Sequence, residues 1–392
     1  MSTFSFILEI RTLVLYLAPL VIILVAVLVL IRFSCGSVQA KRLREGIPDS
    51  ARSPAPLPSL SQAYPAADEP VVQLSPDQLG SGQGELTRTA PPFQAQPLSG
   101  HLSLAVGTLS HPGIKRQWMP NEDSLFAVKG IQSQISQSQP FGLFIVADGM
   151  GGHRYGQEAS RLGIQTMIDQ VLPKISESSE VNEADFRRHL IDGAQAANHA
   201  IYLRNKEQRT EMGTTITAVL IVNAVALVVN VGDSRTYLYR KDGGLRKVTK
   251  DHSLVAYLVE AGIIQPDDIY THPQRNQIYR SLGAEQVIPV DSFREPLQPG
   301  DTVVLCSDGL WEMVRDPLIQ QIVRKGTDAS QTSSALLQAA LHAGGADNVS
   351  VIVIQVTQAQ GSRQSTGLQL LVKPESIALP KLSPREPNTS SQ

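Results

Sequence analysis

Two kinds of apolar pattern alternate between residues 101 and 356 of the chain. Short runs rich in β-branched residues predict strands at 141–147, 216–222, 224–231, 302–306 and 349–356. Segments with apolar residues at i, i+3 and i+4 predict helices at 156–171, 183–204, 317–325 and 329–342. Because several strands follow one another without an intervening helix, the pattern favours antiparallel pairing in mixed layers of sheet and helix.

The first residues of the chain have a different pattern. Residues 13–31 form an apolar run without a charge, close to the roughly 20 residues that cross a bilayer as a helix. Four basic residues follow the run between positions 32 and 44, whereas Arg11 alone precedes it. The positive-inside rule then predicts a single-pass protein of the cell membrane, with residues 1–12 outside and the body of the chain in the cytoplasm. A cleaved signal peptide is the alternative, although the run exceeds the roughly 7–15 apolar residues of such signals.

Two polar segments flank the patterned region. Residues 32–99 form a basic juxtamembrane stretch followed by a linker rich in Pro, Ser, Gln and Gly, and residues 358–392 form a similar tail. Neither has a sustained period of 2 or 3.6 residues, so we expect both to be disordered. Within the tail, the sequence GLQLLV is able to pack locally or to bind a partner.

Charge and cysteine content exclude several classes of protein. The chain has 34 Lys and Arg against 36 Asp and Glu, which argues against the basic footprint of a nucleic-acid-binding protein. Its two cysteines, Cys35 and Cys306, exclude a disulfide scaffold and a cysteine-based metal cage. With 392 residues, 42% of them hydrophobic, the chain is long enough for a substantial core.

Acidic residues stand where the predicted strands begin or end. They are Glu122, Asp123, Asp148, Asp233, Asp308 and Asp347. Gathered at one edge of a sheet pair, these carboxylates would repel one another unless cations neutralise them. Oxygen ligands without cysteine or a histidine pair favour Mg²⁺ or Mn²⁺ over Zn²⁺. Taken singly, each aspartate also fits a turn, and Asp233 also fits a surface ion pair with Arg235.

Seven motifs occur in a fixed order along residues 101–356. They are NED at 121–123, DGMGGH at 148–153, GTT at 213–215, VGDSR at 231–235, DHS at 251–253, SDGLW at 307–311 and GGADNVS at 344–350. The series resembles the bacterial branch of the metal-dependent protein serine/threonine phosphatases of type 2C. The resemblance implies an α+β catalytic domain at 100–357, built as a four-layer α-β-β-α sandwich of two mainly antiparallel sheets flanked by helices. In this chain a single transmembrane helix would precede that domain.

The resemblance also implies a centre with two Mn²⁺ or Mg²⁺ ions. By position, Asp148 resembles the carboxylate that bridges both ions, and the carbonyl of Gly149 resembles a ligand of one. Asp308 and Asp347 match the ligands of the first ion. Glu122 matches the acidic position that serves the second ion, mostly through water.

A third ion and a phosphate-binding arginine follow from the same resemblance. Asp123 and Asp233 resemble the residues that hold a further, weaker ion. Arg116 matches the arginine that contacts the phosphate, although the stretch from Arg116 to Asn121 is two residues longer than the usual pattern, so Lys115 is an alternative. Two ions that share a carboxylate activate a water for attack on phosphorus, and no covalent protein nucleophile is needed.

The donor of a proton to the leaving oxygen is a further candidate role. Animal members of the family carry histidine where this chain has Met150, a side chain that cannot donate a proton. His153 is the candidate donor, and its alternative role is to open the following helix. Residues 251–283 resemble the mobile flap of bacterial members, in which Arg275 and Arg280 are expected to form ion pairs that fix the flap rather than to contact phosphate.

These features lead to one main function and two alternatives. The main prediction is a membrane-anchored phosphatase with a monomeric catalytic domain that acts on phosphoserine and phosphothreonine proteins, membrane kinases among them. A catalytically inactive phosphoprotein-binding scaffold of the same fold is the first alternative, and the presence of Asp148, Asp308 and Asp347 argues against it. The second is a dedicated regulator that dephosphorylates one anti-sigma-factor antagonist.

Overall fold

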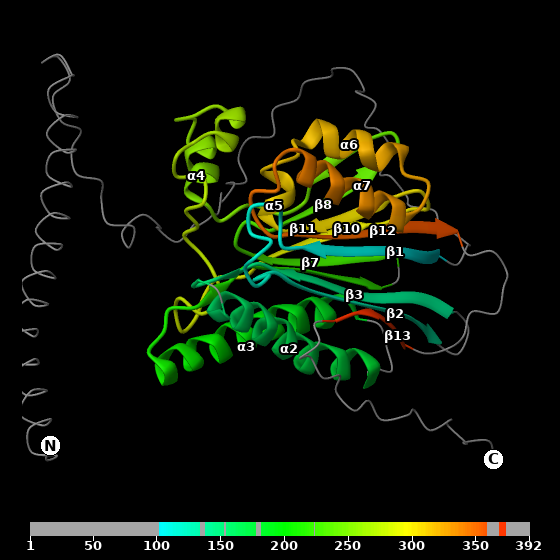
Figure 1. Cartoon of the computed structure of the whole chain (residues 1–392). Helices are drawn as coiled ribbons and strands as arrows, with labels where there is room; N and C mark the ends of the chain where they lie inside the picture. The colour runs from blue at the N-terminus through cyan, green and yellow to red at the C-terminus, as the bar shows by residue number, and fades with distance from the viewer. Residues whose placement is uncertain are drawn as a thin grey trace, which may run out of the picture. The chain divides into compact units, whose positions relative to one another are not determined.

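The computed structural model describes residues 102–133, 138–152, 154–177, 182–222, 224–358 and 368–373 (Figure 1). Its strands are β1 (Leu102–His111), β2 (Ser124–Ser133), β3 (Ser138–Ala147), β4 (Gly149–Met150), β5 (Gly213–Thr214), β6 (Ile216–Val222), β7 (Val225–Val231), β8 (Arg235–Arg240), β9 (Gly244–Lys247), β10 (Asp291–Pro296), β11 (Thr302–Cys306), β12 (Val349–Gln358) and β13 (Leu368–Val372). Its helices are α2 (Arg154–Glu177), α3 (Glu183–Gln208), α4 (Leu254–Glu260), the 3-10 helix η2 (Pro266–Tyr270), α5 (Asp308–Trp311), α6 (Asp316–Lys325) and α7 (Ala329–His342).

The strands form two large sheets and one small one. The five-stranded sheet has the order β1-β12-β11-β8-β9, and the six-stranded sheet has the order β10-β7-β6-β3-β2-β13. The remaining pair, β4 and β5, aligns Gly149 with Thr214 and Met150 with Gly213. All of the described ladders are antiparallel, as the unbroken series of strands in the sequence predicted.

The elements stack in four layers. Figure 1 shows α6 and α7 over the sheet that contains β1 and β12, and α2 and α3 under the sheet that contains β2, β3 and β7. This arrangement confirms the predicted α-β-β-α sandwich with mainly antiparallel sheets. Because both sheets are covered on their outer faces, β6, β7 and β11 are buried along their whole length.

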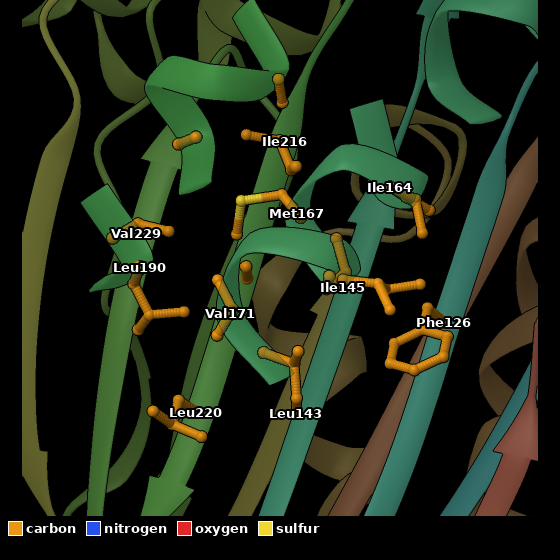
Figure 2. Close-up of a cluster of buried hydrophobic side chains, with 14 of the residues drawn as sticks. Phe126, Leu143, Ile145, Ile164, Met167, Val171, Leu190, Ile216, Leu220 and Val229 are labelled. Carbon is orange, nitrogen blue, oxygen red and sulfur yellow. The ribbon is translucent and has the colours of Figure 1, made fainter. Parts of the chain in front are cut away.

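Three apolar clusters fill the spaces between the layers. One lies between α2, α3 and the six-stranded sheet, a second between the two sheets, and a third between the five-stranded sheet and α5 to α7. Figure 2 shows the first cluster, where Met167 and Val171 of α2 pack on strand residues such as Leu143, Ile145 and Leu220. Each large side chain buried in this way stabilises the fold by about 1.5–3 kcal/mol.

The predicted elements agree with the structure better in their type than in their ends. The strands at 216–222 and 302–306 and the helix at 329–342 have the predicted bounds. The helix predicted at 183–204 continues to Gln208, where Arg209 adopts a left-handed φ of 54° and ends it. Strands β1, β2 and β10 were not among the predicted runs, since each mixes polar and apolar residues.

The C-terminal tail requires a correction. Residues 358–392 were predicted to be disordered, with the sequence GLQLLV able to pack locally. Leu368–Val372 of that sequence does so, as strand β13, which pairs with β2 at the edge of the six-stranded sheet. Leu371 and Val372 pack against the cluster between the sheets, which gives this short apolar segment a reason to order. Residues 374–392 lie outside the described residues.

The predicted membrane segment also lies outside the described residues, as do residues 1–12 and the linker at 32–99. Within the part of the chain that the structure describes, no helix combines the length and the apolar character that crossing a bilayer requires.

Candidate active site

Asp148 follows β3 directly, and two threonines hold its backbone. The Asp148 N–H donates to Oγ1 of Thr215 at 3.0 Å, and the Asp148 carbonyl accepts from Oγ1 of Thr214 and from the N–H of Thr215, both at 2.8 Å. These bonds satisfy the backbone polar groups of Asp148 and fix the point from which its side chain extends. Thr214 and Thr215 therefore pack directly beside the candidate site.

Asp308 and Asp123 come together through Ser307. Asp308 opens α5, and Ser307 links it to the end of β11. The Ser307 hydroxyl donates to Oδ2 of Asp123 at 2.7 Å and accepts from the N–H of Ser350 at 3.0 Å. One serine therefore connects the segments before β2, after β11 and along β12.

Asn348 joins its own segment to two others. Its Oδ1 accepts from the N–H of Glu122 at 2.8 Å, its Nδ2 donates to the carbonyl of Pro112 at 2.9 Å, and its N–H donates to Oδ1 of Asp347 at 2.7 Å. A Cβ atom at Gly309 would lie 2.0 Å from the Asn348 carbonyl oxygen, so only glycine permits this approach of α5. Sequence reasoning included Asn348 in a motif but assigned it no role.

Gly149 and Glu122 meet at the start of α2. The Gly149 N–H donates to the Glu122 carbonyl at 3.2 Å, and the Ser160 hydroxyl donates to the same carbonyl at 2.7 Å. A Cβ atom on Gly149 would lie 2.0 Å from the carbonyl oxygen of Gly156. The backbone of the Asp-Gly pair thus lies against α2 in a way that a larger residue would prevent.

Asp233 follows Gly232 at the end of β7 and is 4% exposed. Its carbonyl accepts from Nε1 of Trp311 at 3.0 Å. The alternative of a surface ion pair with Arg235 is wrong, because Arg235 is buried and pairs with Asp251 at 2.7 Å. Trp311 is fully buried and lies under the Arg235 guanidinium, whose Cζ is 3.6 Å from the ring centroid.

Electrostatics shows that the acidic side chains are neighbours. Burial raises the pKa of Asp148 well above its usual range, and Asp308, Asp123, Asp233 and Asp347 raise it further by repulsion. Burial, followed by repulsion from Asp233 and Asp347, has the same effect on the pKa of Asp308. Burial raises the pKa of Asp123 and of Asp233 to about 7. The structure therefore brings together carboxylates that the sequence separates by more than two hundred positions.

Arg116 reaches this group of acids and Lys115 does not. The guanidinium of Arg116 forms ion pairs with Glu122 through Nη2 and with Asp347 through Nη1. Lys115 is exposed, and its backbone N–H donates to the carbonyl of Gly345 at 3.0 Å. Of the two basic candidates, Arg116 is the one that the structure places at the site.

Glu312 is an acidic neighbour that sequence reasoning missed. It lies four residues after Asp308, and its N–H donates to the Asp308 carbonyl at 2.9 Å. Its side chain is 8% exposed, and Oε2 accepts from Nε of Arg275 at 3.3 Å. The spacing of four residues at the start of a helix places both carboxylates on one face, which is the signal that would have found it.

The predicted flap is held by ion pairs. Arg275 pairs with Glu312, and Arg280 pairs with Asp291 at 2.8 Å, which confirms the expectation for these two arginines. Met150 occupies β4 opposite Gly213. His153, the candidate proton donor, lies outside the described residues.

Several buried oxygens of the acidic group fit a divalent cation. In the described ranges, four such carboxylate oxygens accept no hydrogen bond: Glu122 Oε1, Asp123 Oδ1, Asp308 Oδ1 and Glu312 Oε1. Unpaired buried carboxylate oxygens are costly, and they are the hard donors that Mg²⁺ and Mn²⁺ prefer.

The acids are nonetheless not arranged as a finished coordination shell. Among the residues that the structure describes, no three His, Cys, Asp or Glu side chains form a ready metal site. The two ion pairs of Arg116 contribute to this, because an ion that used Glu122 or Asp347 would have to displace the guanidinium. The donor types fit a divalent cation, although these side chains do not form a coordination shell as they stand.

Comparison with known proteins agrees with the motif series. The family described as Protein phosphatase 2C matches residues 115–343. A serine/threonine phosphatase stp of Listeria innocua is 34% identical over 226 residues, which are 57% of this chain and 88% of the relative. The phosphatase PstP of Mycobacterium tuberculosis is 36% identical over 240 residues, which are 60% of this chain and 42% of the relative.

A crystal structure of the PstP catalytic domain in complex with two manganese ions has a TM-score of 0.54 and 31% identity, and the match covers 66% of this chain and 100% of that one. The family match spans more than half of the residues of this chain, so this chain belongs to the protein phosphatase 2C family.

Proposed function

We propose that this chain hydrolyses phosphoserine and phosphothreonine in proteins with the help of Mn²⁺ or Mg²⁺. The observation that carries the proposal is the gathering of buried carboxylates whose pKa values burial and mutual repulsion raise. Such a group has a strong need for cations. The chain belongs to a family whose relatives are named serine/threonine phosphatases, and phosphate ester hydrolysis is the reaction that fits this site.

Seven residues are proposed to hold the ions. Two ions would lie between Asp148, the Gly149 carbonyl, Asp308, Asp347 and Glu122, and a third, weaker one would lie at Asp123 and Asp233. When bound, the ions lower the pKa of a water and neutralise charge on the phosphoryl group. The chain's own part is to hold Asp148 through Thr214 and Thr215 and to fix Asp347 through Asn348.

Arg116 and His153 are proposed to act on the substrate. The Arg116 guanidinium already contacts two acids of the site, so a phosphoryl group there would compete for its planar pair of donors. His153 remains the candidate proton donor to the leaving serine or threonine oxygen, because the side chain of Met150 cannot donate one.

Phosphate release from a phosphothreonine peptide tests the proposal. The full chain should release phosphate in the presence of Mn²⁺, and excess EDTA should abolish the release. An inactive scaffold would bind the peptide without releasing phosphate under either condition. A panel of phosphoproteins, including an anti-sigma-factor antagonist, would separate a broad phosphatase from a dedicated one.

We further propose that residues 13–31 anchor the chain in the cell membrane with the catalytic domain in the cytoplasm. A flexible linker of about 50 residues has an r.m.s. reach of about 40 Å, so phosphoproteins in the same membrane, kinases among them, would meet the domain at a raised effective concentration. Deleting residues 1–31 should slow turnover of a vesicle-bound phosphoprotein while turnover of a soluble phosphopeptide stays unchanged. Equal effects on both substrates would contradict the anchor.

A further inference from the structure

The loop between β1 and β2 displays large apolar side chains to solvent. Trp118 is 89% exposed, the highest value for a large apolar side chain in the described residues, and Ile114 in the same loop is 48% exposed. Tryptophan is usually well buried, and it is enriched in the parts of interfaces that carry most of the binding energy. Its exposure makes it available for contact with a binding partner.

The backbone of this loop is held in place. The Lys115 N–H donates to the Gly345 carbonyl at 3.0 Å, and the Met119 N–H donates to the Arg116 carbonyl at 2.8 Å, which closes a turn around Trp118. Gly113 has a φ of +79°, and a Cβ atom there would lie 2.1 Å from the Asp347 carbonyl oxygen. The loop is thus docked against the segment that carries Asp347, and the exposure of Trp118 does not result from a loose loop.

The same turn carries a residue of the site. Arg116 precedes Trp118 by two positions and pairs with Glu122 and Asp347. The exposed indole therefore stands within one turn of the group proposed to bind the phosphate. In Figure 1 this turn belongs to the cyan segment that follows β1.

We propose that Trp118, together with Ile114, is a specificity-determining surface for an apolar side chain close to the phosphorylated residue of a protein substrate. A substrate held by its phosphate at Arg116 extends its neighbouring residues over this surface. Exposed Lys115 lies between the two apolar residues in the sequence, so a cationic substrate side chain is disfavoured there. An apolar side chain gains contact with the indole face and is not repelled by Lys115.

The proposal rests on the proposed phosphatase function, and a kinetic experiment separates the two. The full chain is assayed with phosphothreonine peptides that carry a single leucine at each position within three residues of the phosphothreonine, in a background of serine and glycine. At one or more positions, leucine should raise kcat/KM roughly tenfold. This gain should disappear in Trp118→Ala and largely persist in Trp118→Phe, while turnover of the all-serine peptide and of p-nitrophenyl phosphate stays unchanged.

Other outcomes overturn the proposal. If no leucine position helps, if the gain survives Trp118→Ala, or if Trp118→Ala slows all substrates equally, Trp118 is not a specificity surface. A wild-type chain without phosphate release from any substrate would instead refute the proposed function.

Fluorescence gives a second measurement that does not depend on turnover. The chain has two tryptophans, exposed Trp118 and buried Trp311, and the Trp118→Phe variant shows which part of a change in emission comes from Trp118. A phosphonate analogue of the preferred leucine peptide should shift the emission to shorter wavelength, and the serine analogue should not. Trp118→Phe should remove the shift. An identical response to both peptides would contradict the proposal.

Discussion

Two groups of buried acids in this protein have opposite electrostatics. Burial raises the pKa of Asp148 and Asp308, and the neighbouring carboxylates raise it further. Burial acts in the same direction on Asp251, but Arg235 and Lys247 outweigh it and lower the pKa of that carboxyl. Arg235 is itself buried, and Lys247 lies 2.9 Å from the Asp251 carboxylate.

The comparison shows that burial alone does not decide the state of an acid. Around Asp251 the chain provides its own cations. Asp316 lies 3.7 Å from Arg235, so two cations and two carboxylates balance in a unit that ties β8 to the segment before α4. At the ends of β3 and β11 the acids outnumber the cations, with Arg116 as the described cation that pairs directly with Glu122 and Asp347. An excess of buried negative charge persists where a cation from solution completes the site.

The largest expected effect concerns the unbalanced group. Asp148→Asn should lower Mn²⁺-dependent phosphate release by roughly a thousandfold or more, because it removes the carboxylate proposed to bridge the ions. The same change removes one charge from a repelling group, so the melting temperature of the metal-free protein should stay equal or rise. The exposed turn residue Asp242 is the matched control, and Asp242→Asn should change neither quantity.

The balanced group should respond to substitution with a loss of stability. Arg235→Met leaves Asp251 buried without its main partner and should reduce the free energy of unfolding by about 3–5 kcal/mol in chemical denaturation. Arg246→Met breaks the more exposed pair with Glu295 and should cost at most about 1 kcal/mol. Equal losses in the two variants would mean that the Arg235 cluster is not what ties these segments together.

The pH dependence of stability separates the two groups. Asp123 and Asp233 have a folded pKa of about 7, above their usual value of about 3.9, so the folded state holds protons that the unfolded state has released. The melting temperature of the metal-free protein should therefore fall as pH rises from about 4 to about 7. The stability that Asp251 contributes is present across this range and is lost only at lower pH, as pH falls through its depressed pKa.

A variant without these two titratable groups provides the control for this measurement. The double substitution Asp123→Asn, Asp233→Asn should flatten the decline in melting temperature between these pH values. An unchanged slope in the double variant would assign the decline to other groups.

The smallest expected effect concerns the link between the flap and the site. Arg275→Gln removes the ion pair with Glu312. Because the Arg275 side chain is partly exposed, the loss should cost less than about 1 kcal/mol of global stability. Its effect should be local: proteolysis within residues 262–278 should become faster while the melting temperature stays unchanged. A matched change at Arg315, whose pair with Asp267 is exposed, should alter proteolysis less.

The sequence allowed much of the architecture to be predicted, because fully buried strands such as β6 and β11 are continuous apolar runs. Strand β1 was missed, since its burial alternates irregularly along an edge. The sequence GLQLLV was recognised as able to pack locally but not as strand β13, because these residues pair with β2, which is far away in the sequence. Such pairing is a tertiary effect that no local pattern encodes.

The same distinction applies to the site. The acids at strand ends were found because each stands beside a recognisable strand or motif. Glu312 was missed because its role depends on where α5 points. Asn348 was missed because its side chain bonds Glu122 and Pro112, which are far from it in the sequence. The ion pairs of Arg116 with Glu122 and Asp347 likewise depend on how the loop after β1 docks, which spacing alone does not determine.

Calorimetric titration of the metal-free full chain with Mn²⁺ at pH 8 tests the central claim most directly. Two ions should bind, with weaker uptake of a third, and this binding should be lost in Asp148→Asn but not in Asp242→Asn. An absence of Mn²⁺ binding, or binding that Asp148→Asn leaves unchanged, would contradict it.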